Sequence, residues 1–498
     1  MYYLGLDIGS SSIKAALVEM VTGKSMGVVQ EPEQEMGMFA QKNGWAEQKP
    51  DDWWLYVCKA IARLKKQHNI SRTQIKGIGI SYQMHGLVIV DKAGNPLRKS
   101  IIWCDSRAVG IGNEAFKAIG EETCATNLLN SPANFTASKL KWVKHNEPDS
   151  YKNIHKFMLP GDYIAYKFSN IINTTISGLS EGVFWDFKKD TVADFLLEYY
   201  GIDKNLVPDI VETFGIQSVV DEQGEAESGI AKGTPILYRA GDQPNNALSL
   251  NVFNPGEVAA TGGTSGVVYA VTDSLSVKES ARVNNFAHVN YKKGANPRIG
   301  KLLCINGAGI QYRWLLNNLS VNSYEEMNNL ASEIPVGSDG VCVIPFGNGA
   351  ERMLNNTEIG TRIVNLNLNN HHKGHICRAA LEGIAFSFIY GMEIMKSDGI
   401  TPNVIRAGND NLFRSEIFAN TVATLIEQEI EIYNTTGAIG AARAAGLYKG
   451  DFESFGKAII DNDHVMTFMP LKDKTAYQLA YENWKKELEL VFAKEQRK

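Results

Sequence analysis

The sequence predicts an α/β protein with two domains, and three observations support this prediction. A chain of 498 residues exceeds the size at which a single hydrophobic core stops growing. Short apolar strand patterns occur together with helical stretches along the chain. A strand, a loop of small residues and a second strand occupy residues 2–18, and the same order returns at 257–271. We therefore expect a boundary near residue 247, giving domains of residues 1–247 and 248–498.

Composition excludes several classes of partner and compartment. The chain is 44% hydrophobic and 21% charged with a net charge of -5, so we expect no nucleic-acid and no membrane partner. No apolar run approaches the roughly 20 residues that span a bilayer, and the N-terminus lacks the pattern of a signal peptide. The cysteines form no C-x-x-C pair, which argues against a zinc site or a disulfide framework and favours the cytoplasm. They are Cys58, Cys104, Cys124, Cys304, Cys342 and Cys377.

The loop Gly9-Ser-Ser-Ser12 separates the first two expected strands. Backbone N–H groups of such a loop can approach a phosphate because no large side chain intervenes. Asp7, just before the loop, is suited to hold a hydrated Mg²⁺ ion. A plain β-hairpin is the alternative interpretation. The segment is neither a P-loop nor a dinucleotide fingerprint, because no helix follows the glycine.

Asp242 follows the apolar segment 233–239, which reads as the C-terminal end of a strand. Open α/β sheets bind their ligands in a crevice at such strand ends. Small-residue loops occur both upstream, at 7–14, and downstream, at 261–266. We therefore interpret Asp242 as the base of a phosphoryl transfer, and the alternative is a turn residue that hydrogen-bonds its own backbone.

Two further strand ends carry side chains that could recognise a polyhydroxylated molecule. After a helix from Pro50 to about Gln67, the strand 75–81 leads to Met84 and His85. A later apolar segment leads to Trp103, Asp105 and Arg107. The alternatives are a histidine satisfied in the core, a buried tryptophan and a structural Asp105–Arg107 pair.

The remaining segments supply the expected framework. We expect helices at about 134–146, 310–319, 373–396, 412–426 and 437–446, and a strand at 403–406. Residues 169–186 are rich in Ser, Thr and Gly and predict a loop with little regular structure. The small residues of the helix 373–396, including Gly383, predict close packing near the crevice between the domains.

Taken together and in order, these segments resemble the FGGY carbohydrate kinases, and within that family they are most similar to the xylulokinases. The resemblance runs from Tyr3 to about Lys449 and rests on the joint order of many short motifs. These are Asp7–Lys14, Trp45–Gln48 with Trp53-Trp54, Gln83–Gly86, Trp103–Arg107, Phe135–Val143, Leu159–Tyr163, Gly241-Asp242, Gly262–Gly266 and Gly440–Arg443.

The resemblance implies a two-domain fold of the actin/hexokinase/Hsp70 kind, which is ribonuclease H-like, with a deep cleft between the domains. It implies an ATP-dependent kinase that phosphorylates a small-molecule sugar, most simply D-xylulose to D-xylulose 5-phosphate, and it suggests a homodimer. Asp242 would be the general base, and Asp7 with Asp242 would order Mg²⁺. The implied sugar contacts are Met84, His85, Trp103, Asp105, Arg107, Asp242 and Gln243. The implied ATP and phosphate contacts are Gly9, Ser10, Ser11, Ser12, Lys14, Gly263, Thr264, Gly309, Gln311, Gly408 and Asn409.

Two departures from the xylulokinase pattern bear on the substrate. The segment 174–182 lacks the two aspartates of an acidic Thr-Asp-x-Ser-Asp run, and Gln243-Pro244 stands where Asn-Ala is more usual. Lost hydrogen-bond partners can shift selectivity strongly. Another ketose, a polyol or a sugar acid is therefore an alternative substrate, for example ribulose, fuculose, rhamnulose, gluconate or glycerol.

Two rival classes are disfavoured. A non-catalytic sugar- or nucleotide-binding regulator would be expected to lose Asp242 or a phosphate loop, or to gain a DNA-binding module, and no such change is visible. An actin- or chaperone-like ATPase would have no use for the Met84–His85 and Trp103–Arg107 groups.

Overall fold

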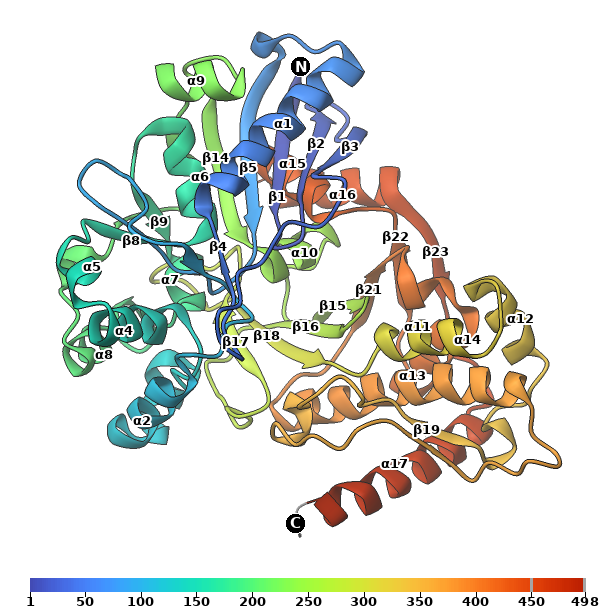
Figure 1. Cartoon of the computed structure of the whole chain (residues 1–498). Coiled ribbons are helices and arrows are strands. Elements are labelled where there is room, and N and C mark those ends of the chain that lie inside the picture. The colour runs from blue at the N-terminus through green and yellow to red at the C-terminus, as the bar shows by residue number, and fades with distance from the viewer. Residues whose placement is uncertain (448–450, 496–498) are drawn as a thin grey trace.

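Two large mixed β-sheets, each covered by helices, form the two ends of the molecule (Figure 1). The computed structural model describes residues 1–447 and 451–495. We call the elements packed on the first sheet the first lobe and those on the second sheet the second lobe. The first sheet has the order β13 (Phe214–Val219), β14 (Pro235–Gly241), β5 (Ile75–Tyr82), β1 (Tyr2–Ile8), β2 (Ile13–Glu19) and β3 (Ser25–Glu31). The second has the order β17 (Asn284–Ala287), β18 (Ile299–Ile305), β16 (Gly266–Thr272), β15 (Glu257–Gly262), β21 (Val404–Gly408), β22 (Ile430–Tyr433) and β23 (His464–Phe468).

Both expected strand–loop–strand units are confirmed as antiparallel hairpins. In the first lobe β1 pairs with β2, and in the second β15 pairs with β16. Each hairpin also has a parallel neighbour, β5 beside β1 and β21 beside β15. The carboxyl ends of the parallel strands therefore meet at one edge of each sheet, where α/β proteins place ligands.

Helix α1 (Pro50–His68) covers β2 and β3 of the first sheet. It begins with Pro50 and two aspartates and ends in lysines and a histidine, which suits the helix dipole. Its inner face buries Trp53, Val57 and Ile61 completely. Truncating a buried tryptophan of this kind costs about 3–5 kcal/mol of folding free energy.

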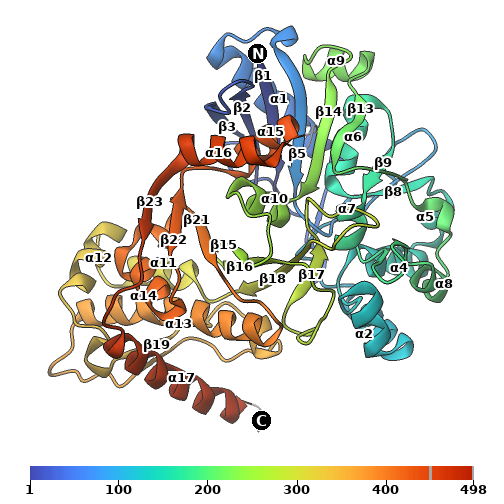
Figure 2. The ribbon, with the colours of Figure 1, turned by 180° about the vertical axis from the view of Figure 1, so that it is seen from behind.

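Helix α15 (Gly437–Gly446) returns from the C-terminal part of the chain to cover the other face of the first sheet (Figure 2). It begins as expected, with the Thr436 side chain accepting a hydrogen bond from the Ile439 N–H. Any β-carbon on Gly5 or Gly79 would overlap a backbone carbonyl of α15. This close approach explains why the helix and the strands beneath it are rich in Gly and Ala.

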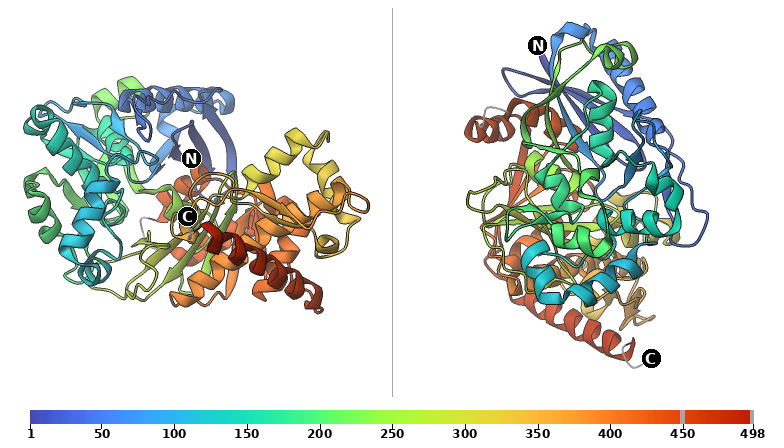
Figure 3. Two further views of the ribbon diagram at one scale, coloured as in Figure 1. Left: turned by 60° about the horizontal axis from the view of Figure 1, so that its bottom comes forward. Right: turned by 90° about the vertical axis from the view of Figure 1, so that its left-hand side faces the viewer.

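The second lobe is organised around the 25-residue helix α13 (Lys373–Ser397), which confirms the helix expected at 373–396. It contacts α11 (Gly309–Asn318), α12 (Tyr324–Ser332), α14 (Glu416–Ile426), β19 (Cys342–Ile344) and α17 (Thr475–Glu495). The placement expected for Gly383 is wrong, because its Cα lies against the Val343 carbonyl of β19 rather than near the junction of the lobes. Helix α17 runs along the outer side of this lobe (Figure 3).

Residues 169–186 do not form the irregular loop that their composition predicts. They contain β9 (Asn173–Thr175), α7 (Ile176–Glu181) and β10 (Trp185–Asp186), and almost all are buried. The Thr175 side chain caps α7 by accepting a hydrogen bond of 3.0 Å from the Gly178 N–H. Contacts with β14 and β17 stabilise this short helix, so tertiary packing overrides weak local propensity.

Smaller differences concern element ends. Asp242 begins helix α10 (Asp242–Ser249) instead of lying in a turn, and the expected boundary at residue 247 falls inside this helix. The apolar strand expected before Trp103 is only β7 (Ser100–Ile101). The helix expected at 412–426 is split, because the Ser415 side chain caps α14 after the 3-10 turn η6 (Asn411–Arg414).

The other elements lie mainly beside the first sheet or at the edges of the lobes. They are β4 (Glu47–Gln48), η1 (Arg72–Gln74), β6 (Val88–Val90), α2 (Val109–Ile119), α3 (Glu121–Thr123), η2 (Cys124–Leu128), α4 (Thr136–Asn146), α5 (Pro148–Lys152), β8 (Lys156–Met158), α6 (Pro160–Ser169), β11 (Thr191–Val192), α8 (Asp194–Tyr200), η3 (Lys204–Leu206), β12 (Asp209–Val211), α9 (Glu222–Ser228), η4 (Ser338–Gly340), η5 (Arg352–Leu354), β20 (Arg362–Val364) and α16 (Phe452–Asp463).

Candidate active site

Asp7 lies near the end of β1, opposite Lys14 on β2 and Ser81 on β5. The Ser81 hydroxyl donates a hydrogen bond of 3.0 Å to Asp7 Oδ1. Burial raises the pKa of the Asp7 carboxyl, while the Lys14 charge and the Ser81 hydrogen bond oppose that shift. A β-carbon on Gly437 would lie 2.7 Å from Asp7 Oδ2, so the start of α15 closes one side of this carboxyl group.

The loop after β1 is closed by its own backbone, with the Gly9 N–H donating to the Ser12 carbonyl at 3.1 Å. The Gln48 side chain donates to the Ser10 carbonyl at 2.7 Å. Trp103 is 53% exposed, and its Nε1 donates to the Ser10 hydroxyl oxygen at 3.3 Å. Residues 9–12 are all at least partly exposed, so the loop is accessible to a ligand. Trp103 thus lies beside the candidate phosphate loop and is not buried.

Asp242 is partly exposed at the start of α10, where β14 ends. Burial raises the pKa of its carboxyl group to about 7, and the negative charge of Asp7 adds to the shift. Hydrogen bonds from Gln243 oppose it. The structure therefore brings together the two carboxylates that the sequence singled out. A carboxylate with a pKa near neutrality is well matched to accept a proton at physiological pH.

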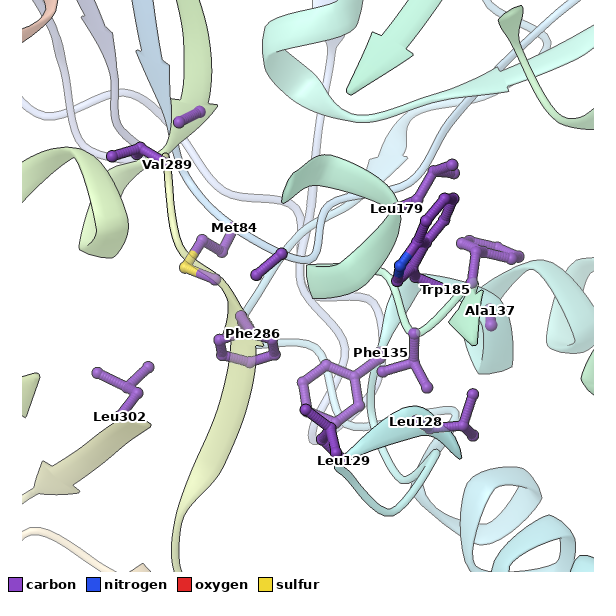
Figure 4. Close-up of a cluster of buried hydrophobic side chains, with 14 of the residues drawn as sticks. Met84, Leu128, Leu129, Phe135, Ala137, Leu179, Trp185, Phe286, Val289 and Leu302 are labelled. Carbon is purple, nitrogen blue, oxygen red and sulfur yellow. The ribbon is translucent and has the colours of Figure 1, made fainter. Parts of the chain in front are cut away.

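Met84 and His85 follow β5, the strand between those that carry the two aspartates. His85 has a left-handed backbone conformation with φ of 61°, and its Nδ1 lies 2.9 Å from the Glu181 carbonyl oxygen. Its ring packs edge-on against the Phe135 ring, with the ring centroids 4.9 Å apart. It also lies beside the Phe286 ring of the second sheet, with the centroids 5.4 Å apart. Figure 4 shows Met84, Phe135 and Phe286 together in this apolar cluster.

The imidazole of His85 is uncharged at neutral pH. Burial, and then the nearby Lys139 charge, lower its pKa to about 3. Lys139 is itself buried, with a pKa lowered to about 7 by burial. Its Nζ donates to the carbonyls of His85 and Ile102 at 2.9 and 3.0 Å. Lys139 therefore fixes the strained backbone that carries His85.

Asp105 and Arg107 are fully buried and contact one another. Arg107 forms ion pairs with Asp105 at 2.6 Å and with Glu47 at 2.7 Å, and its guanidinium stacks on Trp45 at 3.8 Å. Asp105 also accepts a hydrogen bond from the Ala46 N–H at 2.6 Å. These contacts match the structural pair that the sequence left as an alternative. A role for either residue in sugar binding stays a prediction.

Glu181, at the end of α7, was missed by sequence reasoning. A β-carbon on Gly241 would lie 2.6 Å from both Glu181 Oε2 and Met84 Cγ, so the glutamate lies directly behind the residue that precedes Asp242. The Tyr82 hydroxyl faces its carboxyl group without reaching good hydrogen-bond geometry. Burial, and then the Asp242 charge, raise its pKa well above the usual range. The only signal in the sequence was a single carboxylate in an otherwise uncharged stretch.

A cavity of about 870 Å³ opens in the second lobe. Among the residues lining it are three of those expected to contact the nucleotide: Gly263, Thr264 and Gly309. The N–H groups of Gly309 and Ile310 donate to the carbonyls of Gly263 and Thr264, both at 3.0 Å, which joins the β15–β16 loop to the start of α11. The volume lies in the range of small-molecule and cofactor sites.

The same cavity contains polar and aromatic residues that the sequence did not single out. Tyr312 and Tyr324 stack with their ring centroids 5.6 Å apart, and Asn328 also lines the wall. Of the other expected nucleotide contacts, Gln311 is buried and accepts a hydrogen bond of 2.8 Å from the Thr361 hydroxyl. Gly408 ends β21, and the Asn409 N–H donates to the Tyr433 carbonyl at 2.8 Å.

Residues 2–249 match the N-terminal domain of the FGGY family of carbohydrate kinases, and residues 258–447 match its C-terminal domain. The chain belongs to the FGGY family. It is an ATP-dependent carbohydrate kinase with the two-domain actin/hexokinase-like fold. No helix in the described part of this kinase is long and apolar enough to cross a bilayer.

Named relatives of this FGGY kinase support the same assignment. It is 29% identical to a xylulose kinase of Haemophilus influenzae, over 97% of this chain and 98% of the relative. Among solved structures, a xylulose kinase from Rhodospirillum rubrum matches with a TM-score of 0.86 at 23% identity, covering 99% of this chain and 100% of that one. A Plasmodium falciparum glycerol kinase with ADP matches with a TM-score of 0.88 at 19% identity, covering 98% of each chain. The structural matches bear on the fold.

Proposed function

We propose that this kinase transfers the γ-phosphoryl group of ATP to a ketose, with D-xylulose as substrate and D-xylulose 5-phosphate as product. The observation that carries the proposal is the position of Asp242, a partly exposed carboxylate beside Asp7 with a pKa raised to about 7. The xylulose kinase of Haemophilus influenzae, similar over nearly the whole chain, supports this choice of sugar.

In the proposed reaction, a sugar hydroxyl oxygen attacks the γ-phosphorus of ATP. The new O–P bond forms as the bond from γ-phosphorus to the β–γ bridging oxygen breaks, and ADP leaves. The hydroxyl proton passes to the Asp242 carboxylate, which is unprotonated in a substantial fraction of molecules at neutral pH. Such a transfer depends on positioning and charge neutralisation more than on covalent chemistry.

The two small-residue loops would supply that positioning. Residues Gly9–Ser12, with Lys14 on the adjoining strand, would contact the phosphates from the first lobe. Gly263 and Thr264 would contact them from the second lobe, next to the cavity that we assign to the rest of the nucleotide. Backbone donors in such loops approach phosphate oxygens without a side chain in the way.

Asp7 and Asp242 would hold Mg²⁺, and the residues present fit this ion. The negative charge of Asp7 raises the pKa of the Asp242 carboxyl group, and a bound cation would relieve this repulsion. No group of three or more His, Cys, Asp or Glu side chains within residues 1–447 and 451–495 forms a closed metal cage. This suits Mg²⁺, which uses one or two carboxylates with phosphates and water. When bound, the ion would neutralise phosphate charge.

The sugar would lie against Met84 and His85, with Gln243 and Trp103 beside it. The neutral imidazole and the apolar side chains Met84 and Phe286 offer one hydrogen-bonding group within an apolar surface. A site of this composition can hold a sugar by its C–H face while polar groups select its hydroxyls. Exclusion of water at this site would limit futile ATP hydrolysis.

A coupled assay of ADP release with MgATP tests the proposal across D-xylulose, ribulose, fuculose, rhamnulose, gluconate and glycerol. We expect the highest kcat/KM with D-xylulose. A clear preference for another sugar would retain the kinase reaction and overturn the choice of substrate. ATP turnover that no sugar stimulates would contradict the proposal as a whole.

A further inference from the structure

Two consecutive carbonyl groups of the loop after β1 are held by neighbouring segments of the first lobe. The Ser10 carbonyl accepts a hydrogen bond of 2.7 Å from Gln48 Nε2. The Ser11 carbonyl accepts one of 2.8 Å from the Met36 N–H. The loop backbone is therefore fixed in orientation, although residues 9–12 are all at least partly exposed.

Holding these carbonyl groups also sets the direction of the N–H groups that follow them. In a planar trans peptide, a carbonyl and the next N–H group point in opposite directions. The N–H groups of Ser11 and Ser12 therefore point away from Gln48 and Met36. Neither of them donates a hydrogen bond within residues 1–447 and 451–495. Successive backbone N–H groups of this kind can form a concave site for an anion such as phosphate.

The Gln48 side chain is itself oriented from its other side. It is only 2% exposed, and its Oε1 accepts a hydrogen bond of 3.1 Å from the indole N–H of Trp53 on α1. Because an indole N–H can only donate, this contact leaves the amide nitrogen of Gln48 to face the Ser10 carbonyl. Two longer contacts, from Gln83 Nε2 to Oε1 and from Nε2 to the Gly37 carbonyl, are both 3.4 Å. Gln48 thus ties the loop to the buried face of α1.

We propose that Gln48 is a positioning residue for the nucleotide, which holds the Ser10 carbonyl and so directs the Ser11 N–H toward a phosphate oxygen of MgATP. This inference rests on the proposed function, in which residues 9–12 contact the phosphates. The loop follows Asp7, beside the proposed base Asp242, so the terminal phosphates are the ones nearest to it. Gln48 would not touch the nucleotide. It would fix a donor in advance, so that binding needs no reorganisation of the loop.

Kinetics of the Gln48→Glu variant at pH 8 test this assignment. An ionised glutamate keeps an oxygen for the Trp53 N–H but has no N–H to donate to the Ser10 carbonyl. The peptide between Ser10 and Ser11 would lose its anchor and the phosphate its directed donor. Since hydrogen bonds to charged oxygens are stronger than neutral ones, we expect kcat/KM for MgATP to fall about tenfold. The KM for sugar should stay within about twofold, because the sugar contacts are elsewhere.

The matched control is Gln217→Glu, the same change at a second buried glutamine. The Gln217 side chain also donates to two backbone carbonyls, at 2.9 and 3.1 Å. It belongs to β13, which is separated from β1 by β14 and β5. This variant should leave every kinetic constant within about twofold of the wild type.

Calorimetry separates binding of the terminal phosphates from binding of the rest of the nucleotide. The imido analogue of ATP with Mg²⁺ carries the terminal phosphates, whereas AMP lacks them. Gln48→Glu should weaken binding of the analogue about tenfold, since one directed donor to a charged oxygen is lost. It should leave the affinity for AMP within about twofold.

Three results would overturn the inference: an unchanged kcat/KM for MgATP, an equal rise in the KM for sugar, or equal weakening of AMP and the analogue. The last two would mean that Gln48 acts through the fold as a whole. If Gln48→Glu does not fold, as circular dichroism would show, the neutral Gln48→Met variant decides by the same criteria, because it also lacks the N–H donor. If the wild type phosphorylates no sugar, the proposed function fails, and the two nucleotide affinities alone decide on Gln48.

Discussion

The two sheets share one topology but carry different chemistry at equivalent strand ends. The strand order of the first sheet, from β13 to β3, corresponds to that of the second sheet taken from β23 to β18. In this correspondence β1 is equivalent to β15, and β14 is equivalent to β22. Each hairpin ends in a residue pair next to its loop. Asp7 lies one residue before that pair on β1, and Thr261 lies one residue before it on β15. Asp242 follows β14, whereas Asn434 follows β22. Both acids of the first lobe thus have neutral counterparts in the second.

In the proposed reaction, this difference would separate the roles of the lobes. The first lobe gathers the two carboxylates that we propose as proton acceptor and cation ligands. The second has neutral residues at the two strand ends that match Asp7 and Asp242. Its cavity is lined by glycines, hydroxyls, amides and tyrosines together with two acids, Glu325 and Glu416, and two arginines, Arg313 and Arg414. A carboxylate at those two strand ends would repel the phosphates of the nucleotide. Under the proposed function, the same architecture would serve catalysis in one copy and nucleotide binding in the other.

Removing the acid that follows β14 should have the largest effect. General-base catalysis contributes about 100- to 10,000-fold, and Asp242→Asn should lower kcat by about 1,000-fold. The KM values for sugar and MgATP should stay within about threefold, because the amide keeps the shape of the site. Steady-state ADP release measures both. A loss of less than about tenfold would show that the proton has another acceptor.

Introducing the missing acid into the second lobe should have a smaller, selective effect. Thr261 Oγ1 accepts a hydrogen bond of 3.0 Å from the Asn246 side chain. In Thr261→Asp, a carboxylate near the nucleotide phosphates should raise the KM for MgATP about tenfold. Thr261→Asn, of similar size without the charge, is the matched control. Equal effects of the two variants would show that packing, not charge, distinguishes this position.

Replacing Asp242 should also stabilise the metal-free protein at neutral and alkaline pH. Its pKa is 3.8 when unperturbed and about 7 in the fold, so between these values the folded chain binds more protons and loses stability as the pH rises. Asp242→Asn removes this penalty. With EDTA at pH 8, urea denaturation should show a gain of about 1–2 kcal/mol in the free energy of unfolding, a discounted value because the side chain is partly exposed. At pH below 4 the gain should vanish, and a gain independent of pH would refute the burial argument.

The smallest effect is expected at the other buried carboxyl group of this region. Burial and the Asp242 charge raise the pKa of Glu181 well above its usual range, which favours its uncharged form. Glutamine is its neutral isostere, so Glu181→Gln should change kcat and both KM values less than about threefold at pH 7. Glu181→Ala, which opens a cavity behind Gly241, provides the contrasting variant. A loss near that of Asp242→Asn would mean that Glu181 acts as a charged group.

Local sequence patterns were sufficient to predict the elements that have a clear spacing of apolar residues or clear turn residues at their ends. The hairpins at 2–18 and 257–271 have small-residue turns between apolar strands, and α13 repeats apolar residues at helical spacing. Helix α7 could not be found this way, because Ser177, Gly178 and Ser180 have low helix propensity. Its cap at Thr175 and its contacts with β14 and β17 stabilise it instead.

The candidate site was predictable only where strand ends marked it. Asp7 and Asp242 stand at such ends, and the parallel order of β1, β5 and β14 brings them together. Glu181 lies in a segment without a local signature, and only the packing of α7 against β14 shows where its side chain lies. For Asp105 and Arg107 the sequence allowed two interpretations, and only the structure could decide between them. Two residues apart in sequence, they could be read as ligand contacts or as a pair, and the structure pairs them.

Phosphorus-31 NMR of the complete reaction tests the central claim most directly. Wild-type protein, MgATP and D-xylulose should yield a phosphate monoester of the sugar in the same amount as ADP, with little inorganic phosphate. The Asp242→Asn variant should yield neither product at a comparable rate. Inorganic phosphate equal to ADP without a sugar ester, or ester formation that Asp242→Asn leaves unchanged, would contradict an Asp242-dependent sugar kinase.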